Sequence, residues 1–312
     1  MLMHCKERED IMAKHRNLKY QFKNVIDNSF REGMDKHSMK SMGKDNSKIY
    51  SYSDRKNLID LSANFSNYMK EVHPEVKLLK DINSNHIQEF LNSKAEECSQ
   101  ATLNQYQSHF RKLEVLTNNT YKTEVNFHSA ITPISAKNGG GKIRNVMCTD
   151  NQYNQLLKTT NQNLRNALIL AKSFGCRASE CSKMKYSDLK ENGVMIVDSK
   201  GKRSRFVEVE NAQQRKVLEQ LREQGKQGRI CPIQTKSLEQ AFNRECKRQG
   251  IQFQNGAFHT LRKNYATSKF KEYREKGMTV QQALNRVSRN LGHSDKGNRN
   301  DLMKEYICCP IV

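Results

Sequence analysis

Two arginines, two histidines and a tyrosine stand in short segments within the second half of this 312-residue chain. Guanidiniums can bind the charge that develops on a phosphate under attack, imidazoles can move protons, and a tyrosine hydroxyl can act as a nucleophile. These residue types together suit chemistry at a phosphate group. The segments are Gly175-Cys176-Arg177-Ala178-Ser179-Glu180, His259-Thr260-Leu261-Arg262 and Leu291-Gly292-His293, followed by Tyr306.

Each of these residues alone has an ordinary explanation. An Arg that follows an apolar helix is usually surface charge. Eleven tyrosines compete with Tyr306 for the role of nucleophile, and most tyrosines pack in a core with a satisfied hydroxyl. The order of the segments therefore carries the functional interpretation.

In this order the segments resemble the catalytic motifs of the tyrosine recombinases, also called phage-type integrases: Arg-x-x-Glu, a hairpin Lys, His-x-x-Arg, Leu-Gly-His and a terminal Tyr. The run Lys200-Gly201-Lys202-Arg203-Ser204-Arg205-Phe206-Val207 has the form of the family's hairpin turn followed by Arg-x-Val. The resemblance implies these roles: Arg177 and Arg262 as phosphate clamp, Lys200 as general acid, His259 as base, His293 as hydrogen-bond donor, Tyr306 as nucleophile and Glu180 as a supporting residue.

The resemblance implies a site-specific recombinase, a mobile-element or phage-type integrase, that cuts and rejoins duplex DNA through a 3′-phosphotyrosyl intermediate without cofactor or metal. Its implied partners are double-stranded DNA, three further copies in a homotetramer on two DNA sites, and accessory DNA-bending proteins. Its implied location is the nucleoid in a prokaryotic cytoplasm. The alternatives are a chromosome- or plasmid-dimer-resolving recombinase and a type IB topoisomerase; a non-catalytic DNA-binding protein is least favoured.

The charge of the chain is consistent with a polyanionic partner. It carries 54 Lys and Arg against 33 Asp and Glu, a formal net charge of +21. A membrane surface or a solubility role would also suit this charge, but the bases run through most segments and are not gathered on one amphipathic helix. Nucleic acid is therefore favoured. The residues expected to bind DNA are Lys142, Arg144, Lys202, Arg203, Arg205 and Lys263.

Other compositional features narrow the class of protein. No run of about 18 apolar residues is present, so no membrane-spanning helix is expected. The nine cysteines include no Cys-x-x-Cys pair, which fits reduced intracellular thiols better than a disulfide framework or a zinc site.

Apolar periodicity predicts a mainly α fold in two domains. Stripes such as Leu58, Leu61 and Phe65 indicate helices, whereas Gly193–Val209 alternates like a β-hairpin with a basic turn. We expect a helical, SAM-like core-binding domain and a mostly helical catalytic domain with a small antiparallel sheet. The predicted divisions are an N-terminal extension (1–48), the core-binding domain (53–130), a basic Gly-containing linker (131–148) and the catalytic domain (149–312).

Overall fold

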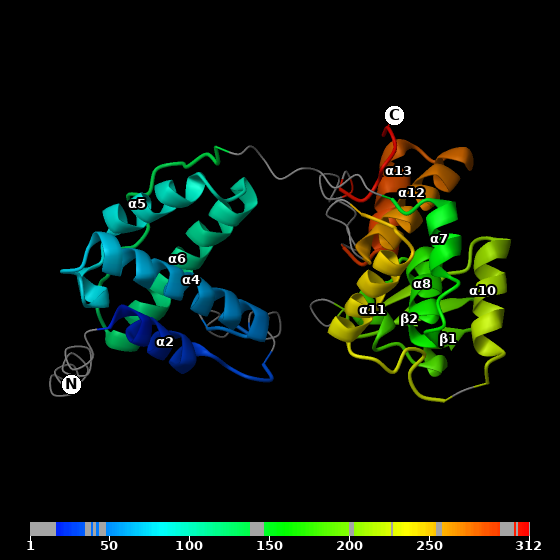
Figure 1. Cartoon of the computed structure of the whole chain (residues 1–312), viewed down its shortest axis with the longest axis horizontal. Coiled ribbons are helices and arrows are strands. Elements are labelled where there is room, and N and C mark those ends of the chain that lie inside the picture. Colours follow the sequence, from blue (N-terminus) through cyan, green and yellow to red (C-terminus); the bar gives the residue numbers. More distant parts are fainter. Residues whose placement is uncertain are drawn as a thin grey trace. The chain divides into compact units, whose positions relative to one another are not determined.

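The chain forms two compact units, Met1–Lys142 and Ile143–Val312 (Figure 1). The computed structural model describes residues 17–34, 39, 42–43, 48–137, 147–199, 203–225, 227–253, 258–293, 303 and 305–311. The division between the units falls inside the segment 131–148, where the sequence predicts a linker. Among the described helices, none combines the length and the apolar character needed to cross a membrane.

Unit 1 is helical throughout its described core. Ser51 and Asn83 begin two of its helices with side-chain oxygens that accept from backbone amides of the first turn, which satisfies donors that the helix itself leaves free. At the centre of the core, the Phe65 ring lies 5.3 Å from Phe90 and 5.2 Å from Phe110, edge to face. The elements are α2 (Leu18–Ser29), α4 (Tyr52–Val72), η1 (Leu79–Asp81), α5 (Ser84–Ala95) and α6 (Gln100–Tyr121).

Helix α2 belongs to this core. The sequence predicts an N-terminal extension over residues 1–48; within it, α2 packs against α4 and α6. Phe22, Val25 and Ile26 are fully buried, and the ring of Phe22 lies 6.2 Å from that of Phe65. The apolar stripe of α2 is the physical reason, because such a face is stable only when another element covers it.

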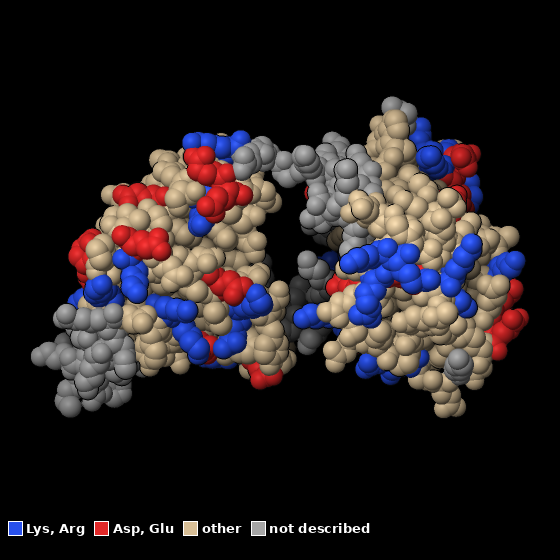
Figure 2. Space-filling view, in the orientation of Figure 1, with Lys and Arg blue, Asp and Glu red and all other residues tan. Residues whose placement is uncertain are grey.

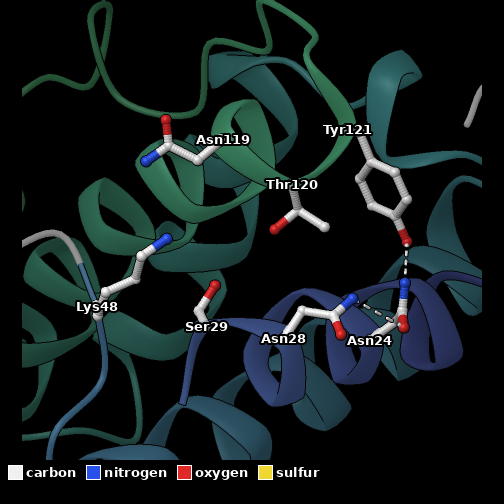
Figure 3. A pocket seen from close by; sticks show the side chains of 7 residues that line it. All are labelled: Asn24, Asn28, Ser29, Lys48, Asn119, Thr120 and Tyr121. Atoms are coloured by element: carbon white, nitrogen blue, oxygen red, sulfur yellow. Dashed lines mark hydrogen bonds between the residues drawn. The ribbon is translucent and has the colours of Figure 1, made fainter. Parts of the chain in front are cut away.

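The polar side of α2 is also tied to unit 1. Asn28 Nδ2 donates to Asn24 Oδ1 at 3.2 Å, and Asn24 Nδ2 donates to the Tyr121 hydroxyl at 3.1 Å, along the wall of a pocket between α2 and the end of α6 (Figure 3). Both faces of α2 therefore contact other elements of unit 1.

We expect Phe22→Ala to lower the free energy of unfolding by about 3–5 kcal/mol, because it removes a buried ring and leaves a cavity. Tyr20→Ala, on the same helix but 48% exposed, should change it by less than about 0.5 kcal/mol. Urea unfolding of the full chain, followed by circular dichroism, measures both. Equal and small effects would place α2 outside the core.

Unit 2 is mostly helical and contains a small antiparallel sheet in the order β1-β2-β3, as the sequence predicts. In the hairpin, Val194 pairs with Val207 and Ile196 pairs with Arg205. The elements are α7 (Asp150–Leu156), α8 (Gln162–Phe174), α9 (Ala178–Cys181), η2 (Tyr186–Asp188), β1 (Leu189–Lys190), β2 (Gly193–Ile196), β3 (Arg205–Glu208), α10 (Ala212–Arg222), α11 (Thr235–Arg248), α12 (His259–Glu275) and α13 (Val280–Asn290).

Helix α12 is buried along most of its circumference. It packs against α8 and α13, and its buried side chains include charged ones, Arg262, Lys263 and Lys269, besides the apolar Leu261 and Phe270. Buried cations are costly unless they are paired, and Lys269 is paired with Glu210 and Glu272, each at 2.9 Å. This central helix carries two of the predicted catalytic residues.

Candidate active site

Arg177 is placed by a sharp reversal of the chain after α8. Gly175 ends that helix with φ at 64°, in the left-handed region that favours glycine. A Cβ at this position would lie 2.5 Å from a ring carbon of Tyr265. The chain then enters α9 with Arg177 at the N-cap, and Nη1 donates to Glu180 Oε1 at 2.7 Å. The spacing Gly-x-Arg-x-x-Glu thus has a local structural reason.

The Glu180 carboxylate is the anion around which the positive groups are arranged. Its side chain is 1% exposed. Oε1 accepts from Arg177 and from the Ser199 hydroxyl, while Arg205 donates to both oxygens at 2.9 and 2.8 Å. A third guanidinium, that of Arg262, lies 3.8 Å from Oε2.

This surrounding charge fixes the protonation state of Glu180. Burial alone would raise the pKa of the carboxyl, but the hydrogen bonds and charge of Arg205 and the charge of Arg262 hold that pKa well below its usual range. Glu180 is therefore ionised at neutral pH, and its geometry suits orientation of its neighbours better than proton transfer.

Arg262 is fully buried near the start of α12. Its Nη1 donates to the carbonyl of Gly175, its Nη2 donates to the carbonyl of Leu291, and Nη2 lies 3.3 Å from His293 Nε2. Its Nε is buried and has no acceptor among the described residues. Burial and the charge of Arg177 lower the pKa of Arg262 to about 10, which leaves it cationic at neutral pH.

Three predicted catalytic side chains surround the ring of Tyr306. The ring centroid lies 5.1 Å from that of His259 and 4.9 Å from that of His293. Arg262 Cζ lies 5.5 Å from the same centroid. His259 begins α12, whereas His293 follows α13 and Tyr306 lies near the end of the chain. The fold of unit 2 thus gathers separate segments around one phenol.

Thr267, which the sequence analysis missed, holds the segment that carries Tyr306. Its hydroxyl donates to the Tyr306 carbonyl at 3.4 Å and accepts from the Cys308 amide at 3.0 Å. Thr267 is 2% exposed on α12. No sequence motif marks Thr267; its need for a hydrogen-bond partner follows from its burial in the structure.

The hairpin turn is only partly described. Ser199 precedes Lys200 directly, and its hydroxyl accepts from Arg177 Nη1 at 3.2 Å. Its amide donates to the carbonyl of Arg203 at 3.0 Å, and Arg203 is exposed. The residues at the start of the hairpin turn therefore contact Arg177. The predicted residues that lie outside the described part of the chain are Lys142, Arg144, Lys200 and Lys202.

Arg205 and Lys263 do not occupy the exposed positions expected of DNA-binding side chains. The Arg205 side chain is 8% exposed and its donors face Glu180 and the carbonyl of Asn290. Lys263 is 6% exposed on the central helix. Arg205 has Nε, Nη1 and Nη2 all engaged by protein acceptors, whereas the fully buried Arg262 keeps an Nε that has no acceptor among the described residues. We therefore do not assign Arg205 and Lys263 to the DNA backbone.

The arrangement favours binding and attack at a phosphate. Three guanidiniums face one carboxylate, so positive charge remains for an anionic group, and preorganised donors of this kind stabilise charge as it develops. A phenol and two imidazoles adjoin them. Within the described ranges, no group of three or more His, Cys, Asp or Glu side chains is arranged to hold a metal ion.

We expect Glu180→Gln to lower the free energy of unfolding at pH 7 by about 3–5 kcal/mol, because it leaves buried guanidiniums without their anion. The folded-state pKa of Glu180 is lowered, so its contribution is complete above the unfolded pKa of about 4.3 and disappears as the pH falls toward the folded value. The difference from wild type should therefore shrink below about pH 4.3.

Urea titrations between pH 7 and pH 3.5 measure this dependence. Glu219→Gln, at an exposed position on α10, is the matched control and should stay within about 0.5 kcal/mol of wild type at each pH. A Glu180→Gln penalty that does not change with pH would contradict the role of the ionised carboxylate.

Comparison with known proteins identifies the class of unit 2. Residues 147–297 match the model of the phage integrase family. Unit 2 therefore carries a phage integrase family domain, in agreement with the motif resemblance. No curated protein sequence gave a significant match.

Several solved structures share the fold. A lambda integrase tetramer bound to a Holliday junction matches with a TM-score of 0.60 and 19% identity, over 87% of this chain and 77% of that chain. A lambda integrase dimer bound to a COC′ core site matches at 0.59 and 21%, over 87% and 74%. The XerH site-specific recombinase in a post-cleavage complex with palindromic difH matches at 0.59 and 18%, over 82% and 76%.

Proposed function

We propose that this protein is a site-specific DNA recombinase, a phage-type or mobile-element integrase, that cuts and rejoins duplex DNA through a 3′-phosphotyrosyl intermediate. The observation that carries the proposal is the convergence of His259, His293 and Arg262 on the ring of Tyr306. A tyrosine is a weak nucleophile at neutral pH and needs a proton acceptor and positive charge beside it.

In the cleavage step, the Tyr306 hydroxyl oxygen attacks the scissile phosphorus and His259 accepts its proton. The new bond joins the tyrosine oxygen to phosphorus, and the bond from phosphorus to the 5′ oxygen breaks. Lys200 protonates the leaving 5′ oxygen. Arg177 and Arg262 bind the non-bridging oxygens, where negative charge grows. The rejoining step is the reverse, with a 5′ hydroxyl of the partner strand as nucleophile.

Two features of the site support these roles. The Arg262 Nε is a buried donor that has no acceptor among the described residues, and buried donors of this kind call for a partner such as a phosphate oxygen. The His293 Nε2 lies 3.3 Å from Nη2 of the same guanidinium and accepts in that contact, because arginine only donates; the His293 ring therefore lies beside the proposed phosphate clamp.

The positive charge supports DNA as the substrate. The chain carries a net charge of +21, and a band of Lys and Arg side chains crosses the face of unit 2 in view in Figure 2. We assign Lys142, Arg144, Lys202 and Arg203 to the DNA backbone. The logarithm of DNA affinity should then fall by about 0.9 per neutralised phosphate for each unit of log salt concentration.

A homotetramer on two DNA sites is the assembly that fits strand exchange, with accessory DNA-bending proteins as further partners and the nucleoid of a prokaryotic cytoplasm as location. The lambda integrase structure described as a tetramer on a Holliday junction supports this proposal. The XerH structure matches about as well, so a dimer-resolving recombinase is the second candidate.

Covalent capture of DNA tests the proposed function. The protein is incubated with sheared genomic DNA from its source organism, detergent removes non-covalent complexes, and DNA that stays attached is sequenced. Nicked duplexes built on the captured sequence should yield a covalent adduct on a denaturing gel. Failure to capture DNA would overturn the proposal. Relaxation of a supercoiled plasmid by the monomer, without strand exchange, would instead indicate a topoisomerase.

A further inference from the structure

Arg205 connects three parts of unit 2 through one buried side chain. It begins strand β3, directly after the hairpin turn. Its Nη1 and Nη2 donate to the two oxygens of Glu180 at 2.9 and 2.8 Å, and its Nε donates to the carbonyl of Asn290 at 2.7 Å. The side chain is 8% exposed. One guanidinium therefore links the hairpin, the Glu180 carboxylate and the end of α13.

The turn that carries His293 is shaped to receive this side chain. Gly292 has φ at 69°, and a Cβ there would lie 3.0 Å from Arg205 Cδ and 3.1 Å from Arg205 Nη1. A methyl group at this position would require the Arg205 side chain to shift by a few tenths of an ångström. The glycine before His293 thus serves two needs, a left-handed backbone and close packing against the Arg205 guanidinium.

The carbonyl that Arg205 binds is itself held in place. Asn290 is the last residue of α13, and its Nδ2 donates to the hydroxyls of Tyr265 at 3.0 Å and Tyr273 at 2.9 Å. Carbonyls in the last turn of a helix lack intrahelical partners and favour a cation. Arg205 therefore binds a fixed acceptor three residues before His293.

We propose that Arg205 is a positioning residue. It sets the placement of Glu180, with the Arg177 and Ser199 side chains that Glu180 binds, relative to the turn that carries His293. The donors of a planar guanidinium have fixed mutual directions. Because three of them are engaged, Glu180 and the Asn290 carbonyl cannot shift independently. Glu180 in turn holds Arg177 and Ser199. The inference rests on the proposed function of Tyr306 and its neighbours.

A role in stability alone is the competing explanation, and the chain offers a matched control for it. Arg286 also joins α13 to β3, through Glu208 at 2.5 Å, and pairs with Glu210 at 3.0 Å. Its side chain is 33% exposed, and its ion pairs with Glu208 and Glu210 do not involve Glu180. Arg286→Ala therefore removes a tie between the same two elements outside the candidate site.

We expect Arg205→Ala to slow adduct formation on saturating nicked duplex by about 100-fold, because small displacements of catalytic groups have effects of this size. The dissociation constant for DNA should change by less than about threefold, and Arg286→Ala should leave both values near wild type. Guanidinium chloride at about 20 mM, far too dilute to unfold the protein, should restore much of the Arg205→Ala rate, whereas equimolar urea should not. Arg205→Lys should remain slow, because one ammonium cannot reproduce the fork.

A cycle with Gly292→Ala tests the contact without DNA. The backbone strain at φ 69° is the same in wild-type protein and in Arg205→Ala. Any difference in the effect of Gly292→Ala between these two proteins therefore isolates the contact with Arg205. Gly292→Ala should raise the unfolding equilibrium constant of the wild-type protein about tenfold more than it raises that of the Arg205→Ala variant.

The two proposals fail in different ways. No adduct from wild-type protein, with the Gly292 coupling intact, overturns the proposed function and the catalytic part of the inference. If wild-type protein forms the adduct normally, three results would overturn the role of Arg205 alone. These are no rescue of Arg205→Ala by guanidinium, an Arg286→Ala effect as large as that of Arg205→Ala, or no coupling between Arg205 and Gly292.

Discussion

Tyr306→Phe should abolish covalent capture of DNA while it leaves the affinity for DNA within about twofold of wild type. The substitution removes the one oxygen that can join the phosphate and little contact area, so binding loses at most a weak hydrogen bond. The ring should keep its place, because His259, His293 and Arg262 contact its faces and edges rather than requiring the hydroxyl. A nicked duplex on a denaturing gel measures the adduct, and a mobility shift measures affinity.

Tyr186→Phe is the matched control. That hydroxyl donates to Gln224 at 2.8 Å elsewhere in unit 2, so its removal should leave adduct formation at the wild-type rate. An adduct that persists in Tyr306→Phe would assign the nucleophile to another residue, and Cys308, two positions later, would be the first to test. Loss of the adduct in both variants would trace the effect to folding.

Much of the fold follows from periodicity in the sequence. The helices of unit 1 and the hairpin over β2 and β3 lie where the apolar patterns predict them. The strand β1 (Leu189–Lys190) was not predicted, because two residues show no alternation. The packing of α2 was not predicted either. An apolar stripe shows that a helix face is buried, but the partner that covers it lies far along the chain.

The site shows the same limit at the level of single side chains. The motif order predicted which residues gather around Tyr306, but a basic run does not show which cations face inward. For Arg205 a signal was present, because side chains two apart on a strand share a face and Val207 is buried. Thr267 lies on a helix rich in charged residues, so its burial could not be predicted from the sequence. Its contacts with the Tyr306 segment depend on tertiary structure.

Lys200→Ala should slow cleavage of ordinary DNA by about 10²–10⁴-fold, the usual contribution of a positioned general acid. Replacement of the leaving 5′ oxygen by a bridging sulfur should remove most of this loss, because a thiolate departs readily without a proton. Ser199, the residue before Lys200 in the sequence, has a hydroxyl that contacts both Glu180 and Arg177.

Lys202→Ala is the control for charge in the same turn. If Lys202 holds the backbone, its loss should weaken DNA affinity most at low salt and lower the slope of log affinity against log salt by about 0.9. The ratio of cleavage rates for oxygen- and sulfur-containing substrates should remain that of wild type. Single-turnover rates at saturating DNA separate the two variants. A Lys200→Ala enzyme that sulfur does not rescue would show that Lys200 stabilises charge or binds DNA, and the proton would then have to come from another group beside the cluster, with His293 the next to test.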